Sequence, residues 1–390
     1  MAQDRAEWVY DRMVNRNPSI RNYFREAAPL LADSCRQMAE RFQQGGRLIA
    51  FGQGPYATDA QHVAVEFVHP AIVGKRALPA LDVSLGFNQW VRALIQPTDI
   101  LMGFGPPKGD PVIDTTIKWA RGHGALTLAV PGGVGEYALP TAPEDEFLHQ
   151  EIMKLLYHTL WETVHVFFEH RELGHAMGAA SFLYPGLGAV RQDTTSILRD
   201  VAESIGEKVT ENLQLRERFA SEQAVVVDEV IRAMAARVHQ GGRVILFGNG
   251  GSATDANDWA MHLIESAPSH PAIPAISLSL DPAVLSAVAN DVGAEVMFLR
   301  QLVAHARPHD VAIAISTSGG SRNILMALEE ARRLGLLTVA LLGYDGGEVL
   351  RRGAADLALV VSSDSVHRIQ EVQSSAYHVI CEALREGVYG

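Results

Sequence analysis

The sequence predicts an α/β protein of two tandem domains, each a parallel sheet flanked by helices in a flavodoxin-like, three-layer α/β/α fold. Two observations predict this class. First, the segment GGRLIAFGQGPYATDA at 45–60 returns as GGRVILFGNGGSATDA at 241–256, and such self-similarity indicates a duplicated domain. Second, short apolar strand-like runs alternate with helical patterns in each half, which favours parallel strands joined by helices.

Further matched pairs extend the repeat along the whole chain. DILMGF at 99–104 matches DVAIAI at 310–315, and LHQEIMKLLYH at 148–158 matches RIQEVQSSAYH at 368–378. The order of the pairs is the same in both halves. The 390 residues also suit two domains of ordinary size. We therefore expect copy one at 1–180 and copy two at 181–390, joined near 175–190 by an Ala- and Gly-rich stretch that carries Pro185.

The expected elements of copy two follow one another in a regular order. They are a polar helix at 222–239, a strand at 243–248, a helix at 252–266, a strand at 310–316, a helix at 321–335, a strand at 337–342 and a long helix at 367–386. The strands are short β-branched runs, and the first of them ends in Gly. Ligands of such sheets bind at the carboxyl ends of strands. The loops after Phe51 and after Ile315 are therefore where chemistry is expected.

Composition excludes several classes of protein. Hydrophobic residues make up 47% and charged residues 20%, which excludes a mainly disordered chain. The net charge of −12 argues against a general nucleic-acid binder. Two cysteines exclude a disulfide framework and a cysteine zinc site. No apolar run approaches the ~18 residues of a membrane span, and the first residues lack the apolar core of a signal peptide. We expect a cytoplasmic protein with no membrane partner.

The loops of copy two have the composition of a phosphate site. Residues 313–321 read IAISTSGGS and lead into a helix. Free backbone N–H groups and the helix dipole at such a point favour an anion. A second loop, GNGGS at 248–252, adds another serine beside glycines. The alternative is that the hydroxyls only cap the two helices.

Copy one lacks this chemistry at the matching loops. They read GPPKGDP at 105–111 and GQGPY at 52–56. Pro106 and Pro107 remove N–H donors, and Asp110 repels an anion. Lys108 alone is a point charge, so a rigid surface loop is the expected interpretation.

Copy one instead keeps a set of residues suited to metal binding or acid–base chemistry. His62 and Glu66 are four residues apart and share a helix face. The matching positions of copy two hold Asp258 and His262. Polar groups in apolar surroundings favour a partly buried cleft, although a solvated surface pair is the common alternative.

A second pair of positions lies on the last helix of each copy. Gln150 and His158 of copy one match Gln370 and His378 of copy two. Eight residues span about 12 Å of helix, so a site using both residues of a pair more naturally draws on two chains or two copies. We therefore expect an active site at an interface.

These segments together resemble the sugar isomerase (SIS) domain family, and within it the phosphoheptose isomerases, which act on sedoheptulose 7-phosphate. The resemblance covers nearly the whole chain, twice. It rests on GNGGSATDA at 248–256, the pair Asn290–Asp291, ISTSGGSRNI at 315–324, GYDGG at 343–347 and RIQE at 368–371.

The resemblance implies roles for individual residues. The implied phosphate-binding residues are Ser252, Ser316, Thr317, Ser318 and Ser321, and the implied sugar-binding residues are Asn249 and Asp291. Glu66 matches the general base and His158 the acid/base histidine. The implied zinc ligands are His62, Glu66, Gln150 and His158. In copy two, Gln370 is a further implied substrate-binding residue and His262 and His378 are catalytic candidates. Asp258, His262 and His378 together are a candidate second metal or acid–base set.

The two copies thus keep complementary parts of one site. The hypothesis is an aldose–ketose isomerase that converts sedoheptulose 7-phosphate through an enediol, with zinc as cofactor. The family assembles its sites between subunits of a homotetramer, so a homodimer of this chain would supply four domains. In the rival arrangement each copy has its own site, one of them degenerate. The alternatives for function are an isomerase of another phosphosugar and a non-catalytic SIS protein that binds a sugar phosphate or another protein.

Overall fold

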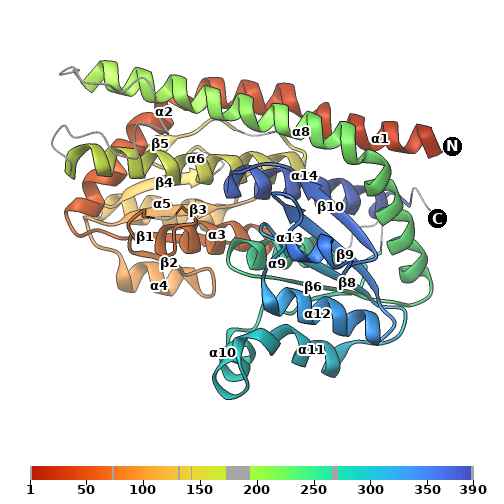
Figure 1. Cartoon of the computed structure of the whole chain (residues 1–390). Coiled ribbons are helices and arrows are strands. Elements are labelled where there is room, and N and C mark those ends of the chain that lie inside the picture. The colour runs from red at the N-terminus through yellow and green to blue at the C-terminus, as the bar shows by residue number, and fades with distance from the viewer. Residues whose placement is uncertain are drawn as a thin grey trace. The chain divides into compact units, whose positions relative to one another are not determined.

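The computed structural model describes residues 2–72, 74–130, 132–141, 143–172, 194–265 and 271–387 (Figure 1). The junction expected near 175–190, with Pro185 and the boundary between 180 and 181, lies outside these described residues. The chain divides into two compact units. One contains Arg16–Leu213, and the other contains Met1–Asn15 together with Gln214–Gly390. Within the described ranges, no helix is long and apolar enough to cross a membrane.

The unit of Arg16–Leu213 is built around a five-stranded parallel sheet. Its strands are β1 (Leu48–Gly52), β2 (Ala80–Asp82), β3 (Ile100–Phe104), β4 (Leu126–Val130) and β5 (Tyr137–Ala138). Its helices are α2 (Asn17–Gln43), η1 (Gly54–Tyr56), α3 (Ala57–Val68), α4 (Phe87–Leu94), α5 (Pro111–Gly122), α6 (Glu146–Glu172) and the first part of α8 (Thr194–His239). The strand order β2-β1-β3-β4-β5 is that of flavodoxin-like folds, which confirms the predicted fold class.

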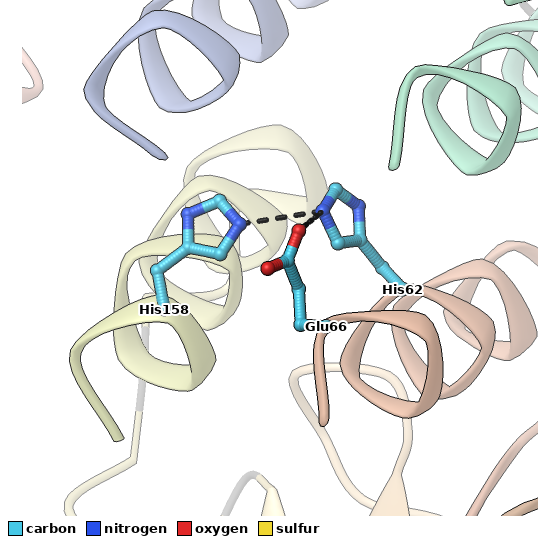
Figure 2. Close-up of side chains that lie close together, drawn as sticks. All are labelled: His62, Glu66 and His158. Carbon is cyan, nitrogen blue, oxygen red and sulfur yellow. Dashed lines mark hydrogen bonds and ion pairs between the residues drawn. The ribbon is translucent and has the colours of Figure 1, made fainter. Parts of the chain in front are cut away.

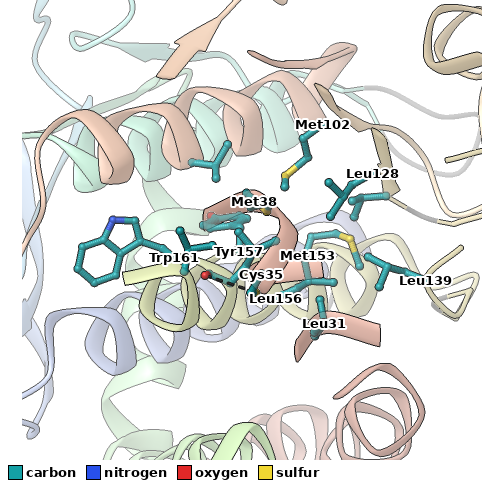
Figure 3. Packing of buried hydrophobic residues seen from close by; sticks show 14 of the residues in the cluster. Leu31, Cys35, Met38, Met102, Leu128, Leu139, Met153, Leu156, Tyr157 and Trp161 are labelled. Carbon is teal, nitrogen blue, oxygen red and sulfur yellow. Dashed lines mark hydrogen bonds between the residues drawn. The ribbon is translucent and has the colours of Figure 1, made fainter. Parts of the chain in front are cut away.

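Alternate residues of each strand face two different cores, as the two-residue period of a strand requires. Leu48 and Ala50 of β1 face the core under α2, α3 and α6, which Figure 3 shows in part. Ile49 and Phe51 face the core under α4 and α5. Because both faces are covered, the central strands β1 and β3 are continuous apolar runs rather than alternating ones. This arrangement is the expected three-layer α/β/α sandwich.

The second unit repeats this plan with the sheet of copy two. Its strands are β6 (Val244–Gly248), β7 (Ala275–Ser277), β8 (Val311–Ser316), β9 (Leu337–Gly343) and β10 (Leu357–Val361). Its helices are α1 (Ala2–Val14), the rest of α8, α9 (Gly251–Ile264), α10 (Pro282–Asp291), η2 (Ala294–Val296), α11 (Met297–His305), α12 (Arg322–Arg333), α13 (Gly347–Arg351) and α14 (Val366–Arg385). The order β10-β9-β8-β6-β7 places the end of β6 at the point where chain direction across the sheet reverses.

The elements expected for copy two are present, with one difference in length. The helix expected at 222–239 begins at Thr194, so α8 has 46 residues. The sequence between 194 and 222 keeps a helical pattern without a strong stop, and Gly206 is tolerated inside the helix. The short strands β7 and β10 were not predicted, because three to five apolar residues give little periodicity.

The N-terminal helical segments are exchanged between the two units. α1 precedes copy one but packs in the other unit against α14, with Val9 and Met13 fully buried. The carbonyl oxygen of Met13 accepts a hydrogen bond from Arg216 Nε (2.8 Å). Conversely, residues 194–213 of α8 contribute Val201 and Ile205 to the core of the Arg16–Leu213 unit. One compact unit is therefore the continuous stretch Arg16–Leu213, whereas the other combines the first 15 residues with Gln214–Gly390.

Deleting residues 2–15 is expected to destabilise copy two rather than copy one. The deletion exposes apolar surface that Val9 and Met13 cover, and burying two such side chains is worth roughly 3–6 kcal/mol. Hydrogen exchange followed by mass spectrometry should show faster exchange in α14 and β9, with little change in α3 and β3. Faster hydrogen exchange confined to the Arg16–Leu213 unit would contradict the packing of α1 in the other unit.

The two cysteines are expected to resist alkylation in the folded protein. Cys35 on α2 and Cys381 on α14 are both free and buried, and burial raises the pKa of each thiol. Cys35 Sγ also donates to the carbonyl oxygen of Leu160 (3.7 Å; Figure 3). Thiolates are the reactive form, so intact mass spectrometry should find no iodoacetamide adduct on the native chain and two after denaturation. Native labelling of either cysteine would contradict its burial.

Candidate active site

Three titratable side chains of copy one converge between α3 and α6. Figure 2 shows the Glu66 carboxylate beside the imidazoles of His62 and His158. His62 Nε2 lies 3.3 Å from His158 Nε2 and 3.6 Å from Glu66 Oε1. All three residues are buried, with exposed fractions of 1%, 0% and 4% for His62, His158 and Glu66. The helical spacing of His62 and Glu66 places both on the face of α3 that packs against α6.

These distances fit a tetrahedral metal site. Two ligands of a zinc ion at about 2.0–2.1 Å lie about 3.3 Å from each other in tetrahedral geometry. The observed separations of 3.3 and 3.6 Å are close to that edge length. Two imidazoles and one carboxylate are also a donor set of catalytic zinc sites. The residues present therefore fit zinc.

Gln150 of α6 contacts α3 one turn before His62. Its Nε2 donates to Asp59 Oδ2 (3.2 Å), and both residues are buried. Because the amide nitrogen is engaged, the amide oxygen is the atom of Gln150 that can ligate a metal. All four predicted ligands of copy one are thus on the packed faces of α3 and α6. Asp59 was not singled out in the sequence, although its position in ATDA one turn before His62 was visible.

Ser321 in the hydroxyl-rich loop of copy two does not cap α12, although Ile324 N in its first turn donates to Asn323 Oδ1 (3.0 Å). Ser321 occupies the N-cap position, but its side chain makes no capping hydrogen bond. Ser316 Oγ accepts from the Gly319 N–H (3.1 Å), and Ser318 Oγ accepts from the Gly320 N–H (3.3 Å). Both hydroxyls are acceptors in these bonds, so their own hydrogens remain to donate to an anion. Ser321 therefore does not act as the helix cap of the alternative interpretation, and the phosphate role of the loop stays a prediction that suits an anion at a helix N-terminus.

The neighbouring loop of copy two is tied to this one. β6 and β8 are adjacent strands, and the loop after β6 begins at Asn249. Asn249 and Asn323 exchange two side-chain hydrogen bonds, Nδ2 to Oδ1, of 3.1 and 2.9 Å. Ser252 is buried in the first turn of α9, whose N-cap Gly250 also makes no side-chain capping bond. Both loops at the reversal point of the sheet thus meet at the start of α12.

Close backbone packing holds the shape of the hydroxyl loop. Gly319 has φ +57°, and a Cβ built on it would lie 2.2 Å from the carbonyl oxygen of Gly346. Only glycine fits there, because its left-handed conformation and the close approach both exclude a side chain. A cleft of about 740 Å³ opens beside the loop, lined by Ser318, Gly320, Tyr344 and Arg351 among others.

In copy one, a carboxylate caps the helix start that matches the start of α12. Asp110 stands where copy two has Ser321, and its side chain accepts hydrogen bonds from Val112 N (2.7 Å) and Ile113 N (3.1 Å) at the start of α5. The N–H groups that an anion would use are therefore occupied by a fixed negative charge. His149 adds no compensating cation, because burial lowers its pKa to about 4. Lys108 is exposed and faces Glu144 (3.8 Å).

Copy two carries its own buried cluster at the positions that match the copy-one set. Asp258 and His262 of α9 meet His378 of α14, and the three form a group whose ligand atoms lie within 4.8 Å of one another. Asp258 Oδ1 lies 3.5 Å from His262 Nε2, and Asp258 Oδ2 lies 3.5 Å from His378 Nε2. Tyr377 was not predicted, and its hydroxyl donates to Asp258 Oδ2 (2.7 Å).

Two remaining residues expected to bind substrate lie elsewhere. Asp291 is exposed at the end of α10, where Asn290 Nδ2 donates to its carboxylate (2.7 Å). Gln370 is buried on α14, and its amide oxygen has no hydrogen-bond partner among the residues that the structure describes. The structure brings neither of them into a hydrogen bond with the hydroxyl loop within the described ranges. Their roles stay predictions.

Comparison with known sequences assigns the family. A model of the SIS domain family matches residues 209–343. Over 187 residues the chain is 35% identical to the phosphoheptose isomerase of Trichlorobacter lovleyi, covering 48% of this chain and 94% of that protein. Over 186 residues it is 43% identical to the phosphoheptose isomerase of Chlorobaculum parvum, covering 47% of this chain and 88% of that protein.

Solved structures similar to the whole chain share its fold. The C-terminal domain of glucosamine-fructose-6-phosphate aminotransferase from Francisella tularensis matches with a TM-score of 0.59 at 9% identity, over 96% of this chain and 95% of that one. Tagatose-6-phosphate ketose/aldose isomerase from Escherichia coli matches with a TM-score of 0.57 at 13% identity, over 98% and 93%. These solved structures show that the fold is shared over nearly the whole chain, and the sequence relatives show that the chain belongs to the family of SIS-domain proteins that includes the phosphoheptose isomerases.

Proposed function

We propose that this chain is an aldose–ketose isomerase of a phosphorylated sugar, and that its substrate is sedoheptulose 7-phosphate, converted to D-glycero-D-manno-heptose 7-phosphate. The observation that carries the proposal is the division of parts between the copies. Copy one keeps the converging set of His62, Glu66 and His158, whereas copy two keeps the hydroxyl loop before α12. The relatives named phosphoheptose isomerase support the choice of substrate.

The reaction needs one base that moves a proton between neighbouring carbons. Glu66 would remove a proton from C1 of the ketose, and the C1–H electrons would form the C1=C2 bond of an enediol. His158 would donate a proton to the oxygen at C2. His158, left without that proton, would then accept the O1 proton, which forms the C1 aldehyde as Glu66 returns its proton to C2. Positioned acids and bases of this kind contribute about 10²–10⁴-fold each to the rate.

Burial supports these roles for Glu66 and His158. A carboxylate in a buried apolar site is a stronger base than one in water, because desolvation disfavours its charged form. A zinc ion held by His62, His158, Glu66 and the Gln150 amide oxygen would polarise the substrate carbonyl and stabilise negative charge on the enediolate. Glu66 Oε1 lies 3.6 Å from His62 Nε2, so the base would stand beside the imidazoles.

The phosphate group would be bound by copy two. The hydroxyls of Ser316, Ser318 and Ser321 and the N–H groups of the first turn of α12 would hold it without a buried cation. We extend the proposal to a cytoplasmic homodimer, whose four SIS domains would pair each catalytic set with a phosphate loop. The alternative assembly keeps a separate site in each copy, with one degenerate.

A proton NMR time course with sedoheptulose 7-phosphate in D₂O tests the proposed function. The proposal expects an aldose phosphate that carries solvent deuterium at C2, because the enediol is protonated from an exchanged Glu66. Unphosphorylated sedoheptulose serves as the matched control and should convert far more slowly.

Two other results would each overturn part of the proposal. Binding without conversion, seen as a rise in melting temperature, would favour another phosphosugar or a non-catalytic protein; His262 in place of a glutamate in copy two already points in that direction. If the sugar phosphate neither binds nor reacts, the proposed function is wrong and only the assignment of the fold remains.

A further inference from the structure

We infer that copy two holds a second metal centre of its own, on Asp258, His262 and His378, for a divalent transition metal of the zinc type. This inference does not depend on the proposed isomerase activity. The donor types are those of copy one, two imidazoles and one carboxylate, but their order along the helix is reversed. In copy one the helix after the ATDA segment carries His then Glu, and in copy two it carries Asp then His.

The reversed order keeps the geometry of a metal site. Asp258 Oδ1 lies 3.5 Å from His262 Nε2, Asp258 Oδ2 lies 3.5 Å from His378 Nε2, and one ligand atom from each residue lies within 4.8 Å of the others. Ligand atoms about 3.3 Å apart are expected around a tetrahedral ion, so both separations are close to that value. The rings of His262 and His378 lie at 5.3 Å between centroids, similar to the 5.1 Å between His62 and His158. The reversed order of imidazole and carboxylate on α9, with Asp in place of Glu, therefore still brings two imidazoles and one carboxylate together.

Neighbouring groups hold the ligands as they do in metal sites. The Tyr377 hydroxyl donates to Asp258 Oδ2 (2.7 Å), which fixes the carboxylate. Trp259 stacks on Tyr377 at 5.3 Å between centroids. Arg385 Nη2 donates to the carbonyl oxygen of His262 (2.5 Å) and thereby anchors the end of α9. Hydrogen bonds that orient ligands in this way are a regular feature of metal centres, and their loss costs about 10–100-fold in metal affinity.

Burial also favours a bound cation. The exposed fractions of Asp258, His262 and His378 are 3%, 1% and 0%. Buried charges are paired or coordinate metals, and one divalent ion would balance the Asp258 carboxylate while both imidazoles stay neutral. The competing explanation is an ion pair between Asp258 and a protonated histidine, and it requires no metal.

The reversal has a consequence for chemistry in copy two. The position that matches Glu66 holds His262, and the one carboxylate of the cluster faces both imidazoles and the Tyr377 hydroxyl. No carboxylate of the cluster is thus left to act as a base of the Glu66 type. The second centre would bind metal without performing the proton transfer proposed for copy one.

Metal counting on the purified full-length chain tests the inference. After chelation, reconstitution with zinc and removal of excess metal, elemental analysis should find two zinc ions per chain. His378→Ala and His158→Ala should each lower the count to one, and the double variant should lower it to none. The exposed His239 is the control, since His239→Ala should leave two ions bound. Circular dichroism and melting temperature check that each variant is folded.

Two further variants separate metal binding from loss of structure. Tyr377→Phe should keep two ions but weaken the second by about 10–100-fold in a competition titration with a chelator. The double change Asp258→His with His262→Glu restores the copy-one order, keeps the donor set and should keep two ions. Cobalt substitution should give visible d–d absorption from two tetrahedral sites.

One result would overturn the inference. A count of one zinc per chain that His158→Ala removes and His378→Ala leaves unchanged would show that Asp258 and the two histidines form an ion pair without metal. Because the count is independent of turnover, a failure of the proposed isomerase activity would not affect it.

Discussion

Replacing Glu66 with Gln is expected to lower kcat by about 10²–10⁴-fold, the range found when a positioned base is lost. Glutamine keeps the shape of the side chain and the buried position between α3 and α6, but its amide does not accept the C1 proton. Binding of sedoheptulose 7-phosphate should persist, because the proposed phosphate loop lies in copy two. Deuterium exchange at C1 in D₂O and isothermal titration measure the two effects separately.

Zinc content and a matched surface variant complete this experiment. Glu144 is exposed on the same copy, so Glu144→Gln makes the same chemical change at an uninvolved position and should leave kcat unchanged. Glu66→Gln could instead lose zinc and regain activity when zinc is added back. That result would assign Glu66 a ligand role rather than a base role. Retention of more than a tenth of the wild-type kcat with normal zinc content would place the base elsewhere.

Replacing Ser321 with Asp is expected to raise KM for the sugar phosphate by about 100-fold while stabilising the fold. The change gives copy two the capping carboxylate that Asp110 supplies in copy one. An N-cap Asp stabilises a helix by about 0.5–2 kcal/mol relative to an uncapped start, and its charge repels phosphate. A variant that is more stable yet binds the sugar phosphate more weakly cannot have lost binding because it unfolded. Steady-state kinetics and thermal melting measure both quantities.

The opposite change in copy one is the control. Asp110→Ser removes two capping hydrogen bonds at the start of α5, so it should lower stability by about 0.5–2 kcal/mol. It should leave KM unchanged, since Pro106 and Pro107 still deny the loop its N–H donors. An unchanged KM in Ser321→Asp would place the phosphate away from α12.

The parts of the fold that depend on local pattern could be predicted from the sequence. The strands around Phe51 and Ile315 are short runs of apolar residues whose two-sided burial makes them recognisable. The i,i+4 spacing of His62 and Glu66 predicted a shared helix face, and the structure adds His158 from α6 to the same point. The sequence also predicted that the loop of copy one does not bind an anion, because the negative charge of Asp110 repels an anion in any fold.

The features that were not predicted depend on contacts between distant residues. The exchange of α1 and residues 194–213 between units leaves no local mark, because a helix with an apolar stripe has the same pattern whichever core it joins. The Asn249–Asn323 pair and the Tyr377–Asp258 hydrogen bond join residues more than 70 positions apart. Such pairs need the tertiary arrangement of strand ends and helix faces.

The most direct test of the division of labour between the copies is the number of sugar phosphates that bind per chain. Isothermal titration of sedoheptulose 7-phosphate into Glu66→Gln, which binds without turnover, should give one site per chain. In copy two Ser321 leaves the start of α12 without a capping hydroxyl, so adding Ser321→Asp should weaken that site about 100-fold. Two sites per chain, or one site whose affinity Ser321→Asp leaves unchanged, would contradict the account.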